Sequence, residues 1–207
     1  MHLTRVILFA SVIIPASTHA AIVGFSGPVQ LIAPPTFIMP GLDYGTPINT
    51  VTVWNERQGI SISGVAMDMV NNFGISTAAV AGTVSGLVDS HFLHYRHTTL
   101  NPVGGHVKFD NPIIGVAFDH LTLDPSDAPL GALGSIYFQG WTRGMPTWGN
   151  DVFSISGGSL KFNLVGHFAY SDTVQLRILT RPIPSPGPVA LLASGGLAIV
   201  RRRRDPH

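Results

Sequence analysis

Histidines form the densest group of side chains in this chain that could do chemistry. The motif His91-x-x-His94-x-x-His97 is preceded by Asp89 and followed by His106. Neutral imidazole binds zinc, copper or nickel, so three such groups could hold one metal ion. Along an extended strand, however, residues three apart face opposite sides, which leaves only His91 and His97 on a common face. The spacing therefore favours structural histidines, and a metal-dependent extracytoplasmic hydrolase is the alternative function.

The carboxylates and hydroxyls show no catalytic pattern. Glu56 is the only glutamate, and most aspartates lie beside turn-like residues: Asp43, Asp110, Asp119, Asp124, Asp127 and Asp151. Aspartate caps turns through its own backbone, which favours a structural role over glycosidase or calcium chemistry. Gly82 to Gly86 has the wrong spacing for a nucleophile elbow, and the absence of cysteine removes thiol chemistry. We therefore expect no catalytic residue, no resident metal and no cofactor.

Two tryptophans are the candidate ligand-binding residues. Trp141 and Trp148 flank a short segment that contains Gly144 and Pro146. Exposed aromatic rings in such loops can stack on sugar rings, whereas tryptophan in general is a highly buried residue. The pair is thus a candidate glycan-binding site, and anchoring of the loop to the core is the alternative.

The elements that must position these residues are strands. Apolar residues alternate with polar ones at a period of two, as in Val107/Phe109, Leu160/Phe162 and Val174/Leu176. Gly157-Gly158 separates two such runs and predicts a two-residue hairpin turn. Pro and Gly dipeptides at short intervals, among them Asp124-Pro125, leave little room for long helices.

We therefore expect an all-β domain over residues 21–181, an antiparallel β-sandwich or jelly-roll-like fold. Val65 to Ala81 is the one stretch that could hold a short helix. Thr122 to Thr147 is expected to be a long loop region with one short strand around Ile136 to Phe138.

The N-terminal 20 residues have the pattern of a secretory signal peptide. A positive charge at Arg5 precedes an apolar run from Val6 to Ile14, and small residues follow. This run is shorter than the ~20 residues that a membrane-spanning helix needs. Thr18 and Ala20 occupy the positions that signal peptidase reads, which predicts cleavage between Ala20 and Ala21.

The C-terminal segment, residues 182–207, has three parts. A proline-rich box is followed by a mostly apolar segment of twelve residues, about 18 Å as a helix, and then by four arginines. Arginines beyond an apolar run stay on the cytoplasmic side of a membrane, so the segment is typical of a temporary membrane stop. An ordinary single-span anchor is the alternative. The residues that carry the pattern are Pro184, Ser185, Pro186, Gly187, Arg201, Arg202, Arg203 and Arg204.

This tail resembles the PEP-CTERM sorting signal of Gram-negative bacteria that make extracellular polysaccharide, with Ser185 in place of the glutamate of the family box. In that family an exosortase removes the tail. The body resembles secreted PEP-CTERM proteins of unassigned activity, through short motifs: Trp54-Asn55-Glu56, Gln58-Gly59, Val88-Asp89-Ser90-His91, Val107-Lys108-Phe109-Asp110 and Asp151 to Ser156. The resemblance implies export, transient anchoring in the inner membrane, and release to the cell surface or extracellular matrix.

The net charge of residues 21–181 indicates which classes of partner are expected. Between Ala21 and Arg181 the chain has seven basic and ten acidic residues, and 7 − 10 gives −3. Nucleic acid is therefore excluded as an expected partner, because phosphate binding needs a clustered basic face. The expected partners are signal peptidase, exosortase and extracellular polysaccharide. The expected function is that of an exported surface or matrix protein, a polysaccharide-associated binding or structural module.

Overall fold

The computed structural model describes residues 20–39, 47–98, 101–145, 150–165 and 173–182. Ala20 and Ala21 fall within these ranges. The rest of the expected signal peptide, Trp148, and the sorting box and arginine cluster of the tail lie outside the described residues. Among the described residues, no helix is both long enough and apolar enough to cross a membrane.

The first of two large sheets, sheet I, is antiparallel throughout and has the order β1-β8-β12-β11-β6. Its inward residues, among them Val107, Phe153 and Phe162, are buried, as their alternation with polar residues predicts. The expected hairpin is confirmed at Gly157-Gly158, where Gly157 has φ 59°. The strands are β1 (Ile22–Ser26), β6 (Phe73–Ile75), β8 (Val103–Phe109), β11 (Val152–Ser156) and β12 (Ser159–Leu164).

Sheet II has the order β2-β4-β7-β13-β9, and its longest strand, β7, extends beyond the other strands and also pairs with β5. The C-terminal half of β7 pairs with β4 and β13, and its N-terminal half pairs with β5. The strands are β2 (Val29–Leu31), β4 (Thr50–Asn55), β5 (Ile60–Met67), β7 (Gly82–Arg96), β9 (Ile113–Ala117) and β13 (Thr173–Thr180).

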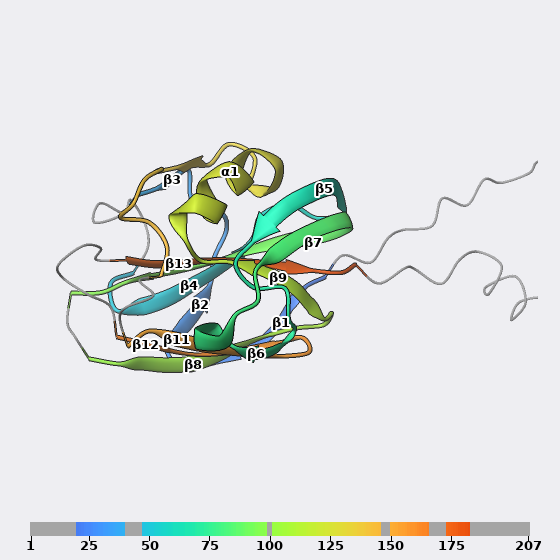
Figure 1. Cartoon of the computed structure of the whole chain (residues 1–207). Helices are drawn as coiled ribbons and strands as arrows, with labels where there is room; N and C mark the ends of the chain where they lie inside the picture. Colours follow the sequence, from blue (N-terminus) through green and yellow to red (C-terminus); the bar gives the residue numbers. More distant parts are fainter. Residues whose placement is uncertain (1–19, 40–46, 99–100, 146–149, 166–172, 183–207) are drawn as a thin grey trace, which may run out of the picture. The chain divides into compact units, whose positions relative to one another are not determined.

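The two sheets pack face to face around one apolar cluster (Figure 1). Leu93 and Leu176 of sheet II meet Phe153, Leu160 and Phe162 of sheet I there. Each of these side chains is almost fully buried. Burial of one such side chain stabilises the fold by about 1.5–3 kcal/mol, which makes this cluster the main source of cohesion between the sheets.

A third layer covers the other face of sheet II and holds a second apolar cluster against it (Figure 1). This layer contains helix α1 (His120–Leu130) and the two-stranded pair β3 (Phe37–Ile38) and β10 (Ile136–Tyr137). Leu123 and Leu130 of α1 pack with Trp54 and Phe92 of sheet II in this cluster. Because both faces of sheet II are covered at its centre, β13 is not the half-buried strand that alternation suggested: all eight of its residues are buried.

The expectation of a loop over Thr122 to Thr147 is wrong for its first part, which is helix α1. Asp124-Pro125, interpreted as a turn, lies inside that helix, as does Pro129. A proline in a helix removes a backbone hydrogen bond, so local preference opposes this helix. Tertiary contacts of its buried face stabilise it instead. The expected short strand near Ile136 is confirmed as β10.

Two further expectations need correction. Sheet II is mixed rather than purely antiparallel, since β2 pairs with β4 in parallel, and the separate pair of β3 and β10 is also parallel. Between Val65 and Ala81 the only helical element is a single 3-10 turn, η1 (Ser76–Ala78), which follows the edge strand β6. Parallel strands need a longer connection than a hairpin, and β3 lies between β2 and β4 in the chain. Alternation of apolar residues carries no information about strand direction, so the sequence did not reveal these pairs.

Candidate functional site

Two buried arginines lie between sheet II and the third layer, and both side chains are fully inaccessible to solvent. Arg177 projects from the middle of β13, and Arg143 follows β10. Their guanidinium groups lie between the rings of Phe92 and Tyr137, at 5.1–5.8 Å from the ring centroids. The aromatic faces stabilise the cations where water cannot reach them.

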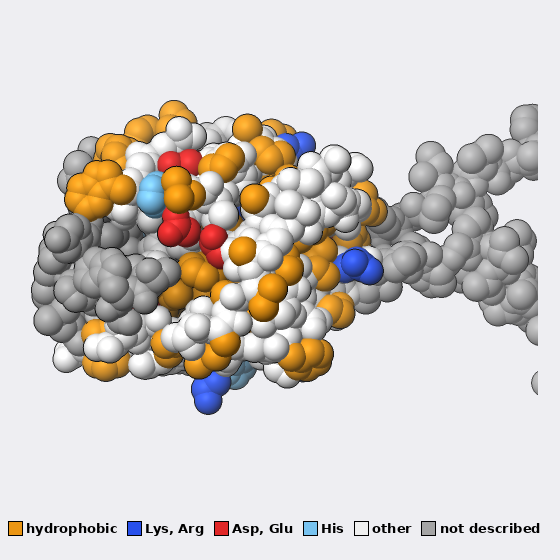
Figure 2. Space-filling model, viewed as in Figure 1, with side chains coloured by type: hydrophobic (Ala, Val, Ile, Leu, Met, Phe, Trp, Pro, Cys, Tyr) orange, Lys and Arg blue, Asp and Glu red, His pale blue; other side chains and the backbone are white. Residues whose placement is uncertain are grey.

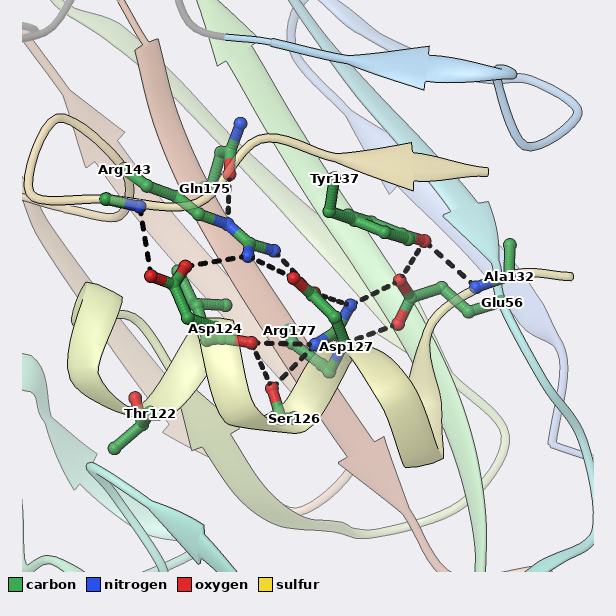
Figure 3. A network of polar contacts seen from close by, with 12 residues as sticks. Glu56, Thr122, Asp124, Ser126, Asp127, Ala132, Tyr137, Arg143, Gln175 and Arg177 are labelled. Atoms are coloured by element: carbon green, nitrogen blue, oxygen red, sulfur yellow. Dashed lines mark hydrogen bonds and ion pairs between the residues drawn. The ribbon is translucent and has the colours of Figure 1, made fainter. Parts of the chain in front are cut away.

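Arg177 is neutralised by carboxylates from two different layers (Figure 3). Its Nε donates to Glu56 Oε2 at 2.7 Å and its Nη2 donates to Glu56 Oε1 at 2.8 Å. Asp127 Oδ1 of α1 lies 2.9 Å from the same Nη2. Burial opposes the charge, but the adjacent Glu56 and Asp127 outweigh it and raise the pKa of Arg177 above its ordinary value. Arg177 is therefore a permanent cation that ties α1 to sheet II.

Arg143 joins the same network from the loop. Its Nη1 and Nη2 donate to Asp127 at 2.5 and 2.8 Å, and Nη1 also donates to Asp124 Oδ1 at 3.0 Å. Its Nε donates to Gln175 Oε1 at 2.8 Å. Asp127 thus links both arginines, and two guanidinium groups face three carboxylates once Glu56 is included.

Tyr137 closes the network over Glu56. Its hydroxyl donates to Glu56 Oε1 and accepts the backbone N–H of Ala132 at 3.0 Å. Burial, followed by the neighbouring Glu56 carboxylate, raises the pKa of Tyr137 above its ordinary value. The phenol therefore stays protonated and keeps the segment after α1 in place.

The result is a rigidly held segment with an apolar outer surface. We call residues 132–143 the anchored aromatic segment. Gly140 N–H donates to Asp124 Oδ2 at 2.9 Å, and Arg143 N–H donates to Gly140 O at 3.0 Å, so both ends of the turn around Trp141 are fixed. Trp141 itself is 67% exposed. Other exposed apolar residues of the segment are Leu133, Ile136 and Phe138.

The surface near this segment is apolar with a few acidic groups. Figure 2 shows hydrophobic and acidic side chains side by side over the region where α1 and β3 lie in Figure 1. An open pocket of about 430 Å³ borders the segment at Ala132 and Leu133. Its other lining residues are Pro34, Glu56, Arg57, Gln58 and Ile60. Exposed aromatic rings such as that of Trp141 can stack on an apolar or sugar surface.

This chain matches no family model, no curated protein and no solved structure at the level of the comparisons made.

The three histidines of the alternative metal site do not converge. His91 faces the core between the sheets, where its ring lies 4.7 Å from that of Phe109. His94 lies on the opposite face of the strand, beside Trp54. His97 stacks on Tyr95, with ring centroids 5.8 Å apart. In the part of the chain that the structure describes, no three His, Asp or Glu side chains are arranged to hold a metal ion.

His91 has a structural role. Its Nδ1–H donates to Asn55 Oδ1 at 2.7 Å, and its Nε2 accepts from the Thr180 hydroxyl at 3.0 Å. Burial lowers the pKa of His91 to about 3. The imidazole is therefore neutral at physiological pH, and both ring nitrogens are occupied by hydrogen bonds.

Two of the short motifs of the body meet where the chain passes from β4 to β5. Residues 56–59 form the connection between β4 and β5 and lie opposite Asp89 and Ser90 of β7, where Ser90 N–H donates to Arg57 O at 2.7 Å. Asp89 accepts the N–H of Gly59, which has φ 62°, and the N–H of Ala20, both at 2.5 Å. These motifs therefore form a strand junction.

Three further aspartates accept hydrogen bonds from backbone N–H groups. Asp119 caps α1, accepting Leu121 N–H at 2.9 Å, and Asp110 accepts Ala21 N–H at 2.9 Å. Asp68 Oδ2 accepts the N–H groups of Phe118 and Asp119 at 2.6 and 2.8 Å. The turn-capping interpretation is confirmed for Asp119.

Sequence reasoning missed the arginine network entirely. Asp124 and Asp127 are three apart, a spacing that places two carboxylates near one another on a helix. That signal was hidden because Pro125 argued against a helix. Their partners Glu56 and Arg177 are 121 residues apart in the chain, and nothing in the local sequence connects them.

Proposed function

We propose that this chain is an exported cell-surface or extracellular-matrix protein whose β-sandwich domain binds polysaccharide through the anchored aromatic segment. In this proposal residues 1–20 are a signal peptide and residues 182–207 are a sorting signal that exosortase removes. The domain acts as a binding or structural module. Neutral sugar surfaces are the expected ligands, because the segment offers rings and no free cation among its described residues.

One observation supports the binding role above the others. Trp141 is 67% exposed, yet its turn is held at Gly140 and Arg143 by the buried network. Exposure of a large aromatic ring costs free energy in a monomeric protein, and rigid support lowers the entropy that binding must remove. An exposed Trp141 ring on a turn held in place therefore supports a role in stacking on a ligand over a role in anchoring the loop to the core.

A glycan array with purified wild-type and Trp141→Ala protein tests this role. Loss of one central aromatic contact should weaken binding by about 2 kcal/mol, or roughly 30-fold. Trp141→Tyr should keep most of the affinity. Leu121→Ala, which removes an exposed apolar side chain on α1, is the matched control and should bind like wild type. Because stacking is not ionic, affinity should change little with salt. Equal binding by wild type and Trp141→Ala, both folded, would refute the role.

The sorting part of the proposal is tested separately. N-terminal sequencing of the exported protein should begin at Ala21. Intact-mass analysis of the released protein should show loss of Arg201 to Arg204. Retention of Met1 contradicts the signal peptide, and full-length protein that persists in the inner membrane of an exosortase-containing host supports the plain anchor instead.

A further inference from the structure

The outer face of sheet I differs in charge from the rest of the domain. The chain has only two lysines, Lys108 and Lys161, and both lie on this sheet. None of its five strands contains an aspartate or a glutamate. The body as a whole has three more acids than bases, so this sheet is a basic exception in an acidic domain.

Strand register places both lysines on the solvent side. Lys161 lies opposite His106, and Lys108 lies opposite Ser159. The alternate residues Val107, Leu160 and Phe162 are buried in the core, so Lys108 and Lys161 point outward, and both are exposed. Their diagonal placement on neighbouring strands puts the two side chains about 7 Å apart at Cβ.

Two rows of side chains cross the outer face. One row runs from Phe73 through Ser156 and Ser159 to Lys108. The next row is the set Ile75, Ser154, Lys161, His106 and Ser26. Each row therefore begins with an exposed apolar side chain on the edge strand β6 and reaches basic side chains beyond one or two serines. Phe73 is 69% exposed, and Figure 2 shows Lys/Arg and His side chains together at the lower margin, where Figure 1 places β8 and β12.

Neither lysine forms an ion pair with an acidic side chain in the described residues. His106 Nδ1 is hydrogen-bonded to the Ser26 hydroxyl at 2.6 Å, which fixes the ring on the face. Two cations without a partner in this part of the chain favour an anionic ligand. The strands are about 4.8 Å apart, so an extended polymer that lies across them meets a new side chain at each strand.

We propose that the outer face of sheet I binds an acidic polysaccharide, with Lys108 and Lys161 pairing with its carboxylates and Phe73 stacking on a sugar ring. Hydroxyl and amide groups beside them, such as Ser154 and Asn163, suit sugar hydroxyls. Two lysines are too few for a nucleic acid, whose phosphates need a denser basic face. The serines and asparagine on the face are poorly suited to a lipid surface, which an amphipathic face enters with apolar side chains.

Binding of the purified full chain to immobilised polygalacturonate tests the proposal, with dextran as the neutral polymer. Wild type should bind polygalacturonate, and its affinity should fall as salt rises. The double variant Lys108→Gln/Lys161→Gln should bind roughly tenfold more weakly at low salt and should lose most of the salt dependence. Phe73→Ala should weaken binding at every salt concentration.

Two controls separate this face from the anchored aromatic segment. Arg181→Gln removes an exposed positive charge outside sheet I and should leave binding unchanged. Leu121→Ala removes an exposed apolar side chain outside both surfaces and should also leave binding unchanged. Polygalacturonate binding that is lost in Trp141→Ala but kept in the lysine double variant would assign it to the anchored aromatic segment, so the two proposals can fail independently.

Several outcomes would overturn the proposal. These are absence of binding by wild type, equal binding by the folded lysine double variant, and equal retention on dextran. Capture by anionic phospholipid vesicles without binding to polygalacturonate would assign the face to a membrane surface. A lysine-dependent and salt-dependent interaction with polygalacturonate supports it.

Discussion

Acid should destabilise this domain through one buried imidazole. An ordinary histidine in the unfolded chain has a pKa of 6.5, whereas burial lowers the pKa of folded His91 to about 3. Between these two values the unfolded chain binds one more proton at this position than the folded chain does. The free energy of unfolding therefore falls as the pH falls below 6.5, and this group has no effect above that value.

The size of the effect follows from the pKa difference. Each pH unit below 6.5 lowers the free energy of unfolding by about 1.4 kcal/mol until the folded pKa is approached. At about pH 5 the loss from His91 alone is about 2 kcal/mol, a large part of the 5–15 kcal/mol that stabilises a typical domain.

Urea unfolding of wild type and His91→Gln over a series of pH values isolates the contribution of His91 to the pH dependence of stability. All other titratable groups are the same in the two proteins. The stability advantage of wild type over His91→Gln should shrink by about 2 kcal/mol between neutral pH and about pH 5. Thr180→Val is the matched control: it removes the hydrogen bond to His91 Nε2 but keeps the imidazole, so its offset from wild type should stay constant with pH.

A wild-type advantage over His91→Gln that does not change across this pH range would refute the argument. It would show that folded His91 takes up its proton as readily as a histidine in the unfolded chain.

Three further changes test the remaining structure. Arg177→Met leaves Glu56 buried without its cation and should lower the free energy of unfolding by about 3–5 kcal/mol in urea titrations; Glu56→Gln in the same chain should restore part of it, and no restoration contradicts the pairing. Arg143→Met should increase amide exchange within residues 132–143 more than in β12, and uniform exchange would show that Arg143 does not anchor the segment. Asp68→Ala should lower the free energy of unfolding by about 1–3 kcal/mol, because the backbone N–H groups of Phe118 and Asp119 lose their acceptor. Thermal melting followed by circular dichroism measures this, and an unchanged melting temperature would contradict the role of Asp68.

Sheet I was predictable from sequence because one of its faces meets solvent. Leu160, Phe162 and Phe153 alternate with polar residues, and the two glycines between β11 and β12 fixed the hairpin. Sheet II was less predictable, because polar residues of β13 such as Arg177 face α1 instead of water. Period-two alternation reports which residues share a face, but it does not report what covers that face.

The candidate site was predictable only in part. Trp141 was identified from residue type and its Gly/Pro-rich surroundings, and its exposure is confirmed. The buried network that holds the turn of Trp141 was not predictable from the sequence. Helix α1 contains two prolines, and the network depends on contacts between residues far apart in the chain. Histidine spacing was similarly uninformative about His91, whose environment is set by Asn55 and Thr180 on neighbouring strands.

The order in which the chain is made has a consequence for β13. This strand is the last of the described strands, yet it lies in the middle of sheet II, between β7 and β9. Until Thr180 has been synthesised, β7 and β9 lack their shared partner, and Glu56 and Asp127 lack Arg177. Contacts over such sequence separations form slowly. The nascent chain should therefore stay unfolded until nearly the whole domain has left the ribosome, a state in which it can still be threaded through a narrow translocation channel.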